Sequence, residues 1–283
     1  MDIEFGTHPP VLNRKAFIHR ERRVQVLAYN RNHHKWFVKP LLRAIRRYGM
    51  IVPGEPVCVA LSGGKDSTAL LWMLAYLNRY SYLHFDLSAL HVRMGDYSTA
   101  VLAGLCDGLG VQYLETRLRP QRVEMEKNAC YVCARIKRGA ISSLLHQRGI
   151  RRVAYGHHAT DVAETFFMNI VHGGRLGSFS PRVGFDDNPM EIIRPMVYLE
   201  ERTIAAIHAY HRLPLLDFRC RYAERNVRAE FKKRLTQLDG LFDVDGFALR
   251  LVSALENVDT GNLWSDVRRD GSRFVPDRKD APR

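Results

Sequence analysis

The sequence predicts an α/β fold, in which helices cover both faces of a mainly parallel, five-stranded, doubly wound sheet. Two observations support this prediction. From residue 57 onward, short apolar runs alternate with longer stretches of helical periodicity. Repeated strand–helix units of this kind build parallel sheets with crossover helices. Polar stretches follow two of the strands, at the edge of the sheet where such folds bind ligands.

Each element follows from its own pattern. The apolar run VCVAL predicts the first strand, and a helix follows where glycines, a lysine and an aspartate interrupt the run. The expected strands cover residues 57–61, 85–92, 111–116, 151–158 and 191–196. The expected helices cover about residues 66–79, 97–109, 131–148, 161–172, 200–211 and 246–257, and residues 172–184 form a glycine-rich loop. Basic, amphipathic helices are expected within residues 11–49.

The chain is basic on both sides of the predicted sheet. Its 283 residues carry 43 Lys and Arg against 30 Asp and Glu, a formal net charge of +13. This charge favours a polyanionic partner, nucleic acid first, although a basic enzyme without such a partner is an alternative. We divide the chain into a basic helical N-terminal extension (1–49), an α/β domain (50–213), a helical C-terminal segment (214–265) and a disordered basic tail (266–283). The basic helices expected over 20–47 and 219–234 are candidates for contacts with an RNA backbone.

Cysteine usage and hydropathy indicate the compartment. Five cysteines are too few and too irregular in spacing for a disulfide framework. No secretory signal is visible, and no apolar run approaches the roughly 20 residues of a membrane span. We therefore expect a cytoplasmic protein without a membrane partner, in which a Cys-x-x-Cys pair binds metal or acts in redox chemistry more often than it forms a bridge.

The stretch SGGKDS, residues 62–67, follows the first strand and opens a helix. Glycines allow the backbone to pass close to an anion, and the first N–H groups of a helix point toward it. Lys65 adds a positive charge, and Asp66 is an acid suited to Mg²⁺. The stretch is neither a Walker A loop nor a dinucleotide fingerprint. An ordinary glycine turn with a helix cap is the structural alternative.

The stretch CYVCARIKRG brings two thiols, Cys130 and Cys133, three positions apart. Thiolates at this spacing can chelate a metal or a cluster, can form a redox pair, or can be unrelated. The basic residues Arg135, Lys137 and Arg138 would favour the thiolate forms.

The stretch GHHATDVAET joins the end of a strand to the start of a helix. His157 and His158 end the strand, and Asp161 and Glu164 lie near the positive end of the helix. One interpretation is helix capping by Thr160 or Asp161, with histidines that have no special role. The other is a His/Asp metal site, which the lack of a third ligand at a suitable spacing disfavours.

The order of these motifs resembles that of the tRNA 2-thiocytidine synthetase family of PP-loop ATP pyrophosphatases. The resemblance covers roughly residues 35 to 264 and is carried by SGGKDS, C-x-x-C with its basic residues and GHHATDVAET, followed by GGRL, IRP and ALENV. It implies an enzyme that splits ATP to AMP and pyrophosphate, adenylates the C2 oxygen of a cytidine at tRNA position 32, and replaces it with sulfur from a 4Fe–4S cluster.

The resemblance also implies the site residues and partners. It assigns the binding of ATP, with Mg²⁺, to Ser62, Gly63, Gly64, Lys65, Asp66, Ser67, Gly156 and His157, and that of the cluster to Cys130, Cys133 and Cys220. The implied catalytic residues are Lys65, Asp66, Asp161, Cys130 and Cys133. Cys58 and Cys106 are expected to be core thiols. The implied partners are tRNA, a sulfur donor such as a cysteine desulfurase, and an electron donor; the oligomeric state stays open, a homodimer included.

Two alternatives stay open. One is another PP-loop tRNA-modifying enzyme without a cluster, lysidine synthetase-like or thiouridine-forming, with zinc or free thiols at the Cys-x-x-Cys pair. The other is a non-catalytic protein that binds adenine nucleotides on the same α/β core.

Overall fold

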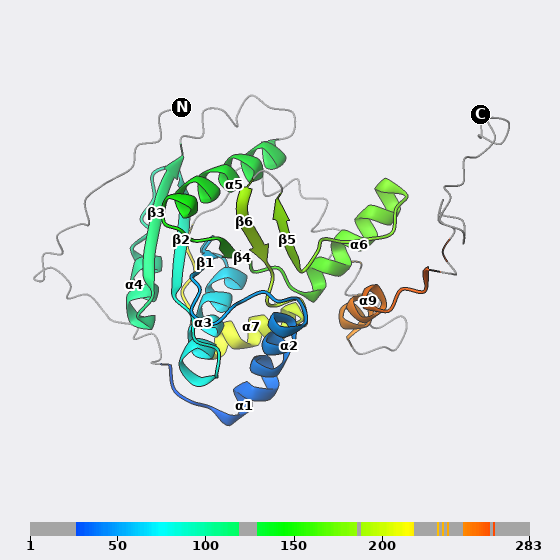
Figure 1. Cartoon of the computed structure of the whole chain (residues 1–283), viewed down its shortest axis with the longest axis horizontal. Coiled ribbons are helices and arrows are strands. Elements are labelled where there is room, and N and C mark those ends of the chain that lie inside the picture. Colours follow the sequence, from blue (N-terminus) through cyan, green and yellow to red (C-terminus); the bar gives the residue numbers. More distant parts are fainter. Residues whose placement is uncertain are drawn as a thin grey trace, which may run out of the picture.

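A computed structural model describes residues 27–118, 129–185, 188–217 and 246–260, with residues 231, 234, 237 and 263. It contains a six-stranded sheet in the order β3-β2-β1-β4-β6-β5 (Figure 1). The strands are β1 (Val57–Ala60), β2 (Leu87–Met94), β3 (Gln112–Leu118), β4 (Arg152–Ala154), β5 (Arg182–Phe185) and β6 (Asn188–Ile193). Neighbouring strands from β3 to β6 pair in parallel. The expected α/β fold with a mainly parallel sheet is therefore confirmed.

The expected number of five strands is wrong, because a sixth strand begins inside the segment predicted as a glycine-rich loop and ends one residue beyond it. This strand, β5, runs antiparallel to β6 at the edge of the sheet and pairs Arg182 with Ile193. Its sequence RVGF combines a charge and a glycine with two apolar residues and carries no strand signal of its own. The neighbouring edge of β6 supplies the pairing partner that the local sequence does not reveal.

The helices lie close to the expected positions. They are α1 (Arg31–His33), α2 (Lys39–Arg47), α3 (Lys65–Tyr80), α4 (Ala100–Leu109), α5 (Ala129–Gln147), α6 (Ala159–Gly173), α7 (Glu201–Tyr210) and α9 (Phe247–Glu256), with a π-helical turn at His34–Val38 between α1 and α2. One face of the sheet packs against α5, through Ile141, Leu144 and Leu145. The other face packs against α3 and the helices around it. The sheet is therefore covered on both faces, as predicted.

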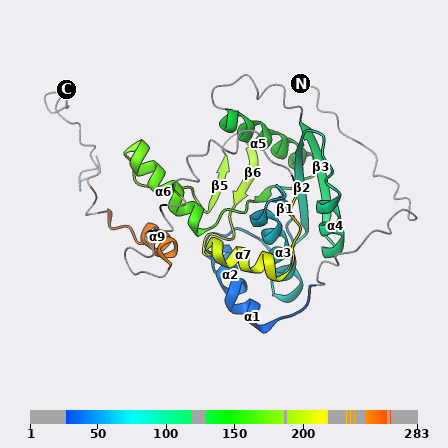
Figure 2. The ribbon, with the colours of Figure 1, turned by 180° about the vertical axis from the view of Figure 1, so that it is seen from behind.

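Helix α3 is the central element of the larger layer. Every residue from Ser67 to Leu77 is buried, between the sheet on one side and α7 with the first helices on the other (Figure 2). A helix that is apolar on all sides is stable only in such an enclosed position. Phe37 and Leu41 from the N-terminal helical segment belong to the same hydrophobic cluster. The start of α3 is therefore held in a fixed place by its packing.

Glu256 attaches the last described helix, α9, to α2. Its carboxylate accepts hydrogen bonds from the hydroxyls of Tyr48 and Tyr198, and it pairs with Arg47 Nε at 2.9 Å and Arg43 Nη2 at 3.4 Å. Burial alone would raise the pKa of Glu256, but these donors lower it below its ordinary value. The ALENV stretch thus joins the C-terminal part of the chain to the N-terminal part.

Several predictions concern residues outside the described ones. These are the N-terminal segment up to residue 26, most of the basic helix expected over 219–234, Cys220, and the tail over 266–283. Among the described helices, none combines the length and the apolar character needed to cross a membrane.

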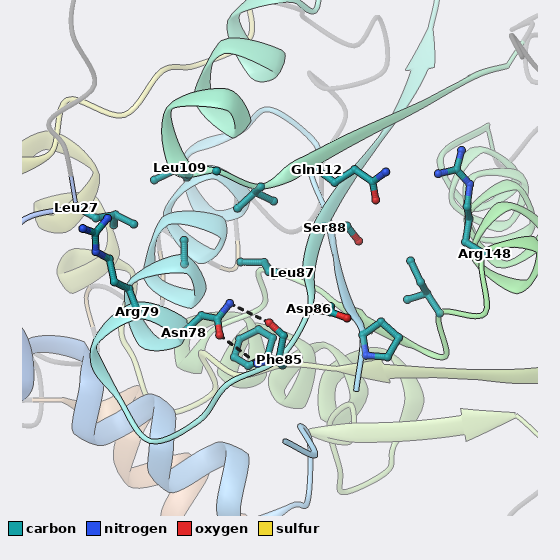
Figure 3. Close-up of a pocket in the computed structure, with 15 residues that line it drawn as sticks. Leu27, Asn78, Arg79, Phe85, Asp86, Leu87, Ser88, Leu109, Gln112 and Arg148 are labelled. Carbon is teal, nitrogen blue, oxygen red and sulfur yellow. Dashed lines mark hydrogen bonds between the residues drawn. The ribbon is translucent and has the colours of Figure 1, made fainter. Parts of the chain in front are cut away.

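A cavity of about 710 Å³ opens at the edge of the sheet where β1, β2 and β3 begin (Figure 3). Its wall includes Arg79, Asp86, Ser88, Gln112 and Arg148. Parallel α/β sheets bind their ligands beyond the opposite ends of the strands. The position of this cavity therefore separates it from the SGGKDS stretch, which follows the carboxyl end of β1.

A pair of buried histidines joins the N-terminal helices to the end of α7. The Nε2 atoms of His33 and His211 lie 3.2 Å apart, and the ring of His211 stacks on Trp72 with the centroids 3.7 Å apart. Burial lowers the pKa of both histidines, that of His211 to about 4 with a contribution from His33. The unfolded chain therefore binds a proton at a higher pH than the folded protein does.

This pair predicts a loss of stability in mild acid. The contribution of the buried His211 to the free energy of unfolding is complete above about pH 6.5, where the imidazole is neutral in the folded and the unfolded chain. This contribution is lost as the pH falls toward 4. We expect the free energy of unfolding to fall by about 2 kcal/mol between pH 8 and pH 5 from His211 alone, measured by urea denaturation. His211→Gln should reduce this dependence, whereas His146→Gln, at an exposed position, should not. A His211→Gln variant with an unchanged pH dependence would contradict the prediction.

Candidate active site

The SGGKDS stretch forms a tight loop between β1 and α3. Gly64 is the N-cap residue of α3, and Gly63 has a φ of +87°, which favours glycine. The Ser67 hydroxyl accepts hydrogen bonds from the Gly63 N–H at 3.2 Å and from the Ser62 hydroxyl at 3.0 Å. It donates to the Gly64 carbonyl at 3.0 Å. These bonds fold the loop around the first turn of α3. First-turn N–H groups have no acceptor within their own helix, so the loop has the form of an anion cradle.

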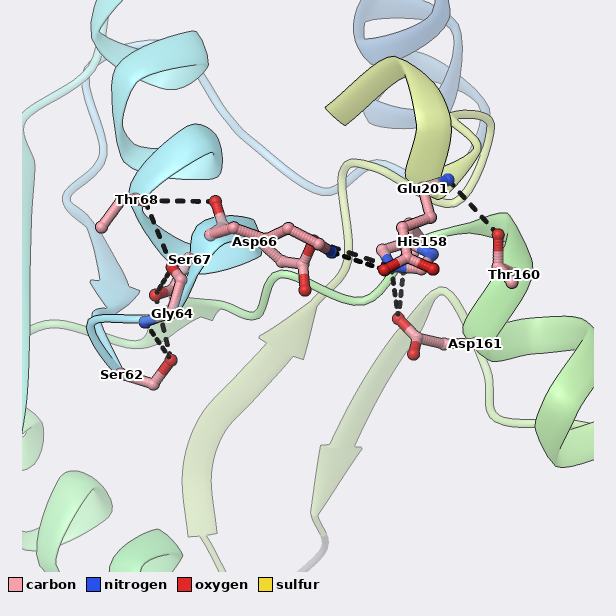
Figure 4. Close-up of polar contacts among 10 residues, drawn as sticks. Ser62, Gly64, Asp66, Ser67, Thr68, His158, Thr160, Asp161 and Glu201 are labelled. Atoms are coloured by element: carbon pink, nitrogen blue, oxygen red, sulfur yellow. Dashed lines mark hydrogen bonds and ion pairs between the residues drawn. The ribbon is translucent and has the colours of Figure 1, made fainter. Parts of the chain in front are cut away.

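Three helices begin close to this loop (Figure 4). Lys65 at the start of α3 contacts Glu201 at the start of α7, with Nζ and Oε1 2.8 Å apart. The Glu201 N–H donates to the Thr160 hydroxyl, at the start of α6, at 3.3 Å. The N-terminus of a helix carries a partial positive charge. The meeting of three such ends favours the binding of a polyanion, such as the triphosphate of ATP.

His158 lies between two carboxylates of this region. Its Nε2 is 3.8 Å from Asp66 Oδ1 and 3.5 Å from Asp161 Oδ2, and only 2% of the residue is exposed. Burial lowers the pKa of His158, although the carboxylates of Asp161 and Asp66 act in the opposite direction. The imidazole is therefore neutral at pH 7. Asp161 also accepts the backbone N–H of His158 at 2.9 Å, which confirms the capping interpretation for Asp161. The N-cap residue is His158, whose side chain takes part in the capping box, so the expectation that the histidines have no special role is wrong for His158.

Lys65 lies between two acids. Its Nζ is 2.6 Å from Asp66 Oδ1 and 2.8 Å from Glu201 Oε1. Burial alone would lower the pKa of Lys65, but the hydrogen bonds to Asp66 and Glu201 raise it above its ordinary value. The ammonium therefore stays charged. Glu201 was not predicted as a site residue, because an acid at a helix start is ordinary and its contact with Lys65 depends on the packing of α7 on α3.

Gly156 brings the GHH stretch against the loop. A Cβ at this position would lie 3.1 Å from the Asp66 carbonyl oxygen and 3.2 Å from the Ser67 nitrogen, so a side chain there would disturb the start of α3. His157 contacts a different group: its Nδ1 accepts Arg194 Nε at 3.3 Å, and its ring lies against Phe179. The structure thus brings together Ser62–Ser67, Gly156 and Asp161, with His157 directed toward Arg194.

The end of β2 lies beside the end of β1. His91 is 3% exposed, and its Nδ1 lies 2.7 Å from the Leu61 carbonyl oxygen, just before the loop. Arg93, two residues later, pairs with Asp96 at 3.0 Å and Glu115 at 3.6 Å. The end of β2 is thus held by the contact of His91 with Leu61, which follows β1, and by the ion pairs of Arg93.

The Cys-x-x-Cys stretch lies in the first turns of α5. Cys133 is half-buried, and its Sγ lies 3.5 Å from the sulfur of Met94, at the end of β2. Cys130 is three residues earlier in the same helix, so the two positions share one helix face. Of Cys130 the structure describes the backbone alone, and Cys220 lies outside the described residues. Within the described part of the chain, no three His, Cys, Asp or Glu side chains are arranged to hold a metal.

The other two described cysteines are core residues. Cys58 and Cys106 are fully buried, as predicted, and burial raises the pKa of each thiol to about 12. Such thiols are inert at neutral pH.

Gly63 is the glycine of the loop with the tightest surroundings. A Cβ there would lie 2.5 Å from Leu216 Cβ, and the Leu216 N–H donates to the Gly63 carbonyl at 2.9 Å. We expect Gly63→Ala to displace the segment around Leu216 and to lower the free energy of unfolding by about 2–4 kcal/mol, from backbone strain and overpacking. Urea denaturation measures this loss, and a titration with ATP measures the accompanying loss of binding.

Gly54→Ala is the matched control for this prediction. Gly54 has a φ of +80°, but no atom lies within 4 Å of an added Cβ. Its substitution therefore brings the backbone strain without the clash. Equal losses of stability in the two variants would show that packing against Leu216 has no effect.

The chain is similar to known proteins in sequence and fold. The model of the PP-loop domain family matches residues 31–237. A tRNA-cytidine(32) 2-sulfurtransferase of Xanthomonas euvesicatoria pv. vesicatoria (strain 85-10) is 36% identical over 208 residues, which are 71% of this chain and 68% of that protein. A protein of the same name from Psychrobacter sp. (strain PRwf-1) is 32% identical over 256 residues, 87% of this chain and 68% of the relative.

A solved structure has the same fold. The U34-tRNA thiolase NcsA from Methanococcus maripaludis, solved with its 4Fe-4S cluster, superposes with a TM-score of 0.61. The superposition covers 82% of this chain and 85% of that protein, at 18% sequence identity. At this identity the likeness concerns the fold.

Proposed function

The chain belongs to the PP-loop domain family and is 36% identical to a tRNA-cytidine(32) 2-sulfurtransferase, and on that premise we propose that it is an ATP-dependent tRNA sulfurtransferase. Its substrate is a cytidine of tRNA, with position 32 as the expected site. The observation that carries the proposal is the loop of Ser62–Ser67 at the meeting of three helix starts, in a chain whose relatives carry this name.

The residues of the loop would act on the phosphates of ATP. The N–H groups at the start of α3 and the ammonium of Lys65 would hold the pyrophosphate part and stabilise its developing charge as it leaves. The C2 oxygen of the cytidine forms a bond to the α-phosphorus while the bond to the β-phosphate oxygen breaks. The C2 position then carries a good leaving group, AMP, which sulfur at the oxidation level of sulfide replaces.

Asp66 and Asp161 fit a role as Mg²⁺ ligands. Both carboxylates approach the same edge of His158, and Mg²⁺ in nucleotide sites is held by one or two carboxylates together with phosphate oxygens and water. A neutral His158 between them adds no charge that would compete with the metal. The described donor set thus fits a metal that ATP brings with it.

The donor chemistry of α5 fits an iron–sulfur cluster. Cys133 is half-buried at the end of β2, beside the polarisable sulfur of Met94, and the position of Cys130 shares its helix face. Cys130, Cys133 and Cys220 would hold the cluster, and a bound cluster would supply sulfur near the carboxyl ends of the strands. A sulfur donor and an electron donor complete the proposal, and the basic charge of the chain favours tRNA.

Nucleoside mass spectrometry of tRNA from a deletion strain tests the proposal. We expect 2-thiocytidine to disappear and to return when the gene is supplied again. Purified protein should also form AMP and pyrophosphate in a tRNA-dependent manner. Unchanged 2-thiocytidine in a host that makes it would contradict the substrate, and colourless, zinc-containing protein from an anaerobic preparation would contradict the cluster.

A further inference from the structure

The meeting point of the three helix starts carries more negative than positive charge. Asp66, Asp161 and Glu201 lie in the first turns of α3, α6 and α7. The ammonium of Lys65 pairs with two of these acids, Asp66 and Glu201. Three carboxylates against one ammonium leave an excess of negative charge where a polyphosphate has to bind. The contacts of each acid show how this excess is divided.

The three acids have different partners (Figure 4). Asp66 and Asp161 both approach the Nε2 edge of His158, at 3.8 and 3.5 Å. Asp66 Oδ1 also lies 2.6 Å from Lys65 Nζ. Glu201 contacts the same ammonium, with Oε1 and Nζ 2.8 Å apart, and its side chain is 19% exposed. Asp66 and Asp161 are therefore placed for a cation that arrives with the nucleotide, while Asp66 and Glu201 both hold the ammonium of Lys65.

Glu201 is fixed more firmly than Lys65. Its backbone N–H donates to Thr160 Oγ1 at 3.3 Å, and α7 is anchored by the fully buried Ile204 and Ile207. Lys65 has a long, flexible side chain with 31% of its surface exposed. When a phosphate enters the loop, Lys65 is the partner that can turn toward it, and it has to leave the carboxylate to do so.

We propose that Glu201 is a positioning residue for Lys65. The Glu201 carboxylate holds the Lys65 ammonium at the start of α7, and the site therefore binds metal-bound polyphosphate in preference to metal-free polyphosphate. The inference rests on the proposed use of ATP at this loop. A metal-free polyphosphate must displace Glu201 from Lys65 and also meets the charges of Asp66 and Asp161. A magnesium-bound polyphosphate would meet these two acids with its own cation, which would also take the place of Lys65 beside Asp66. It therefore depends less on drawing Lys65 away from Glu201.

Binding of inorganic pyrophosphate to the full-length protein tests this role without any turnover. In buffer with EDTA, Glu201→Gln is expected to bind pyrophosphate about tenfold more tightly than the wild type, by isothermal titration calorimetry. With saturating Mg²⁺ the gain should be smaller, so the preference of the wild type for the metal-bound form should decrease. A merely structural role of Glu201 would weaken binding in both buffers.

The neighbouring acid provides a matched control. Glu200 also lies at the start of α7, but its carboxylate accepts hydrogen bonds from Arg202, at 2.9 Å from Nε and 2.8 Å from Nη2. Glu200→Gln removes the same charge one residue away and should change pyrophosphate affinity less than about twofold. In a Lys65→Met background the effect of Glu201→Gln should be lost, because the effect acts through the ammonium.

Several outcomes would overturn the inference. These are unchanged or weaker metal-free pyrophosphate binding in Glu201→Gln, an equal gain in Glu200→Gln, and a gain that persists without Lys65. The result is independent of tRNA thiolation: a protein that makes no 2-thiocytidine but shows the expected binding keeps the inference and loses the substrate. A wild-type protein that binds neither pyrophosphate nor ATP overturns both.

Discussion

Replacement of Asp66 by Asn is expected to lower the rate of tRNA-dependent AMP formation by about a hundredfold or more. The substitution keeps the shape of the side chain and removes the charge that faces both Lys65 Nζ, at 2.6 Å, and His158. A neutral amide binds Mg²⁺ more weakly than a carboxylate does, so the concentration of Mg²⁺ needed for half-maximal rate should also rise. Release of AMP and pyrophosphate from ATP, followed at several Mg²⁺ concentrations, measures both effects.

Asp86→Asn is the control for this prediction. Asp86 lies just before β2, in the wall of the cavity at the opposite edge of the sheet. The same substitution there should leave the rate and the Mg²⁺ dependence within about twofold of the wild type. An Asp66→Asn variant that folds and forms AMP at the wild-type rate would remove Asp66 from the catalytic residues.

Replacement of Cys133 by Ala is expected to abolish the formation of 2-thiocytidine and to leave pyrophosphate binding unchanged. The thiol lies on α5, at the end of β2, and is not part of the loop that would hold phosphates. Loss of one of the three proposed thiolate ligands should release the proposed cluster, with loss of iron and of the broad absorbance near about 400 nm. Anaerobic purification with an iron assay, an absorbance spectrum and a pyrophosphate titration checks these expectations together.

Cys106→Ala provides the comparison for the thiol. Cys106 is fully buried in α4, and burial raises the pKa of its thiol to about 12. The Cys106→Ala protein should lose some stability, because the substitution leaves a small cavity, but should keep its iron and colour. A Cys133→Ala protein with wild-type iron content would show that Cys133 is not a ligand. A variant that loses pyrophosphate binding as well would show that α5 and the phosphate loop are not independent.

The sequence predicted the parts of the fold that depend on local patterns. The apolar run of β1, the glycines after it and the apolar helix α3 each have a signal within a few residues, because strand and helix periodicity and left-handed glycines are properties of short segments. The same holds for the capping of α6 by Asp161. The antiparallel strand β5 was missed, because its pairing with β6 supplies what its own four residues lack.

The candidate site was predicted in part for the same reason. The motif residues Ser62–Ser67, Gly156 and Asp161 come together because parallel strands bring the segments after β1 and β4 to one edge of the sheet. His157 is next to Gly156 in the chain, but its ring is directed to Arg194 and Phe179. A motif fixes where the backbone passes and leaves the direction of each side chain to its neighbours.

By itself, the sequence determined the α/β fold, the position of the phosphate loop and the separation of the core thiols Cys58 and Cys106 from the Cys-x-x-Cys pair. Only the tertiary structure decided that Glu201 holds Lys65 and that His33 meets His211. These contacts join residues that are far apart in the chain, through the packing of α7 on α3 and on the N-terminal helices. The physical reason is that periodicity and turn chemistry act within single segments, whereas ion pairs and buried polar pairs depend on how separate segments pack.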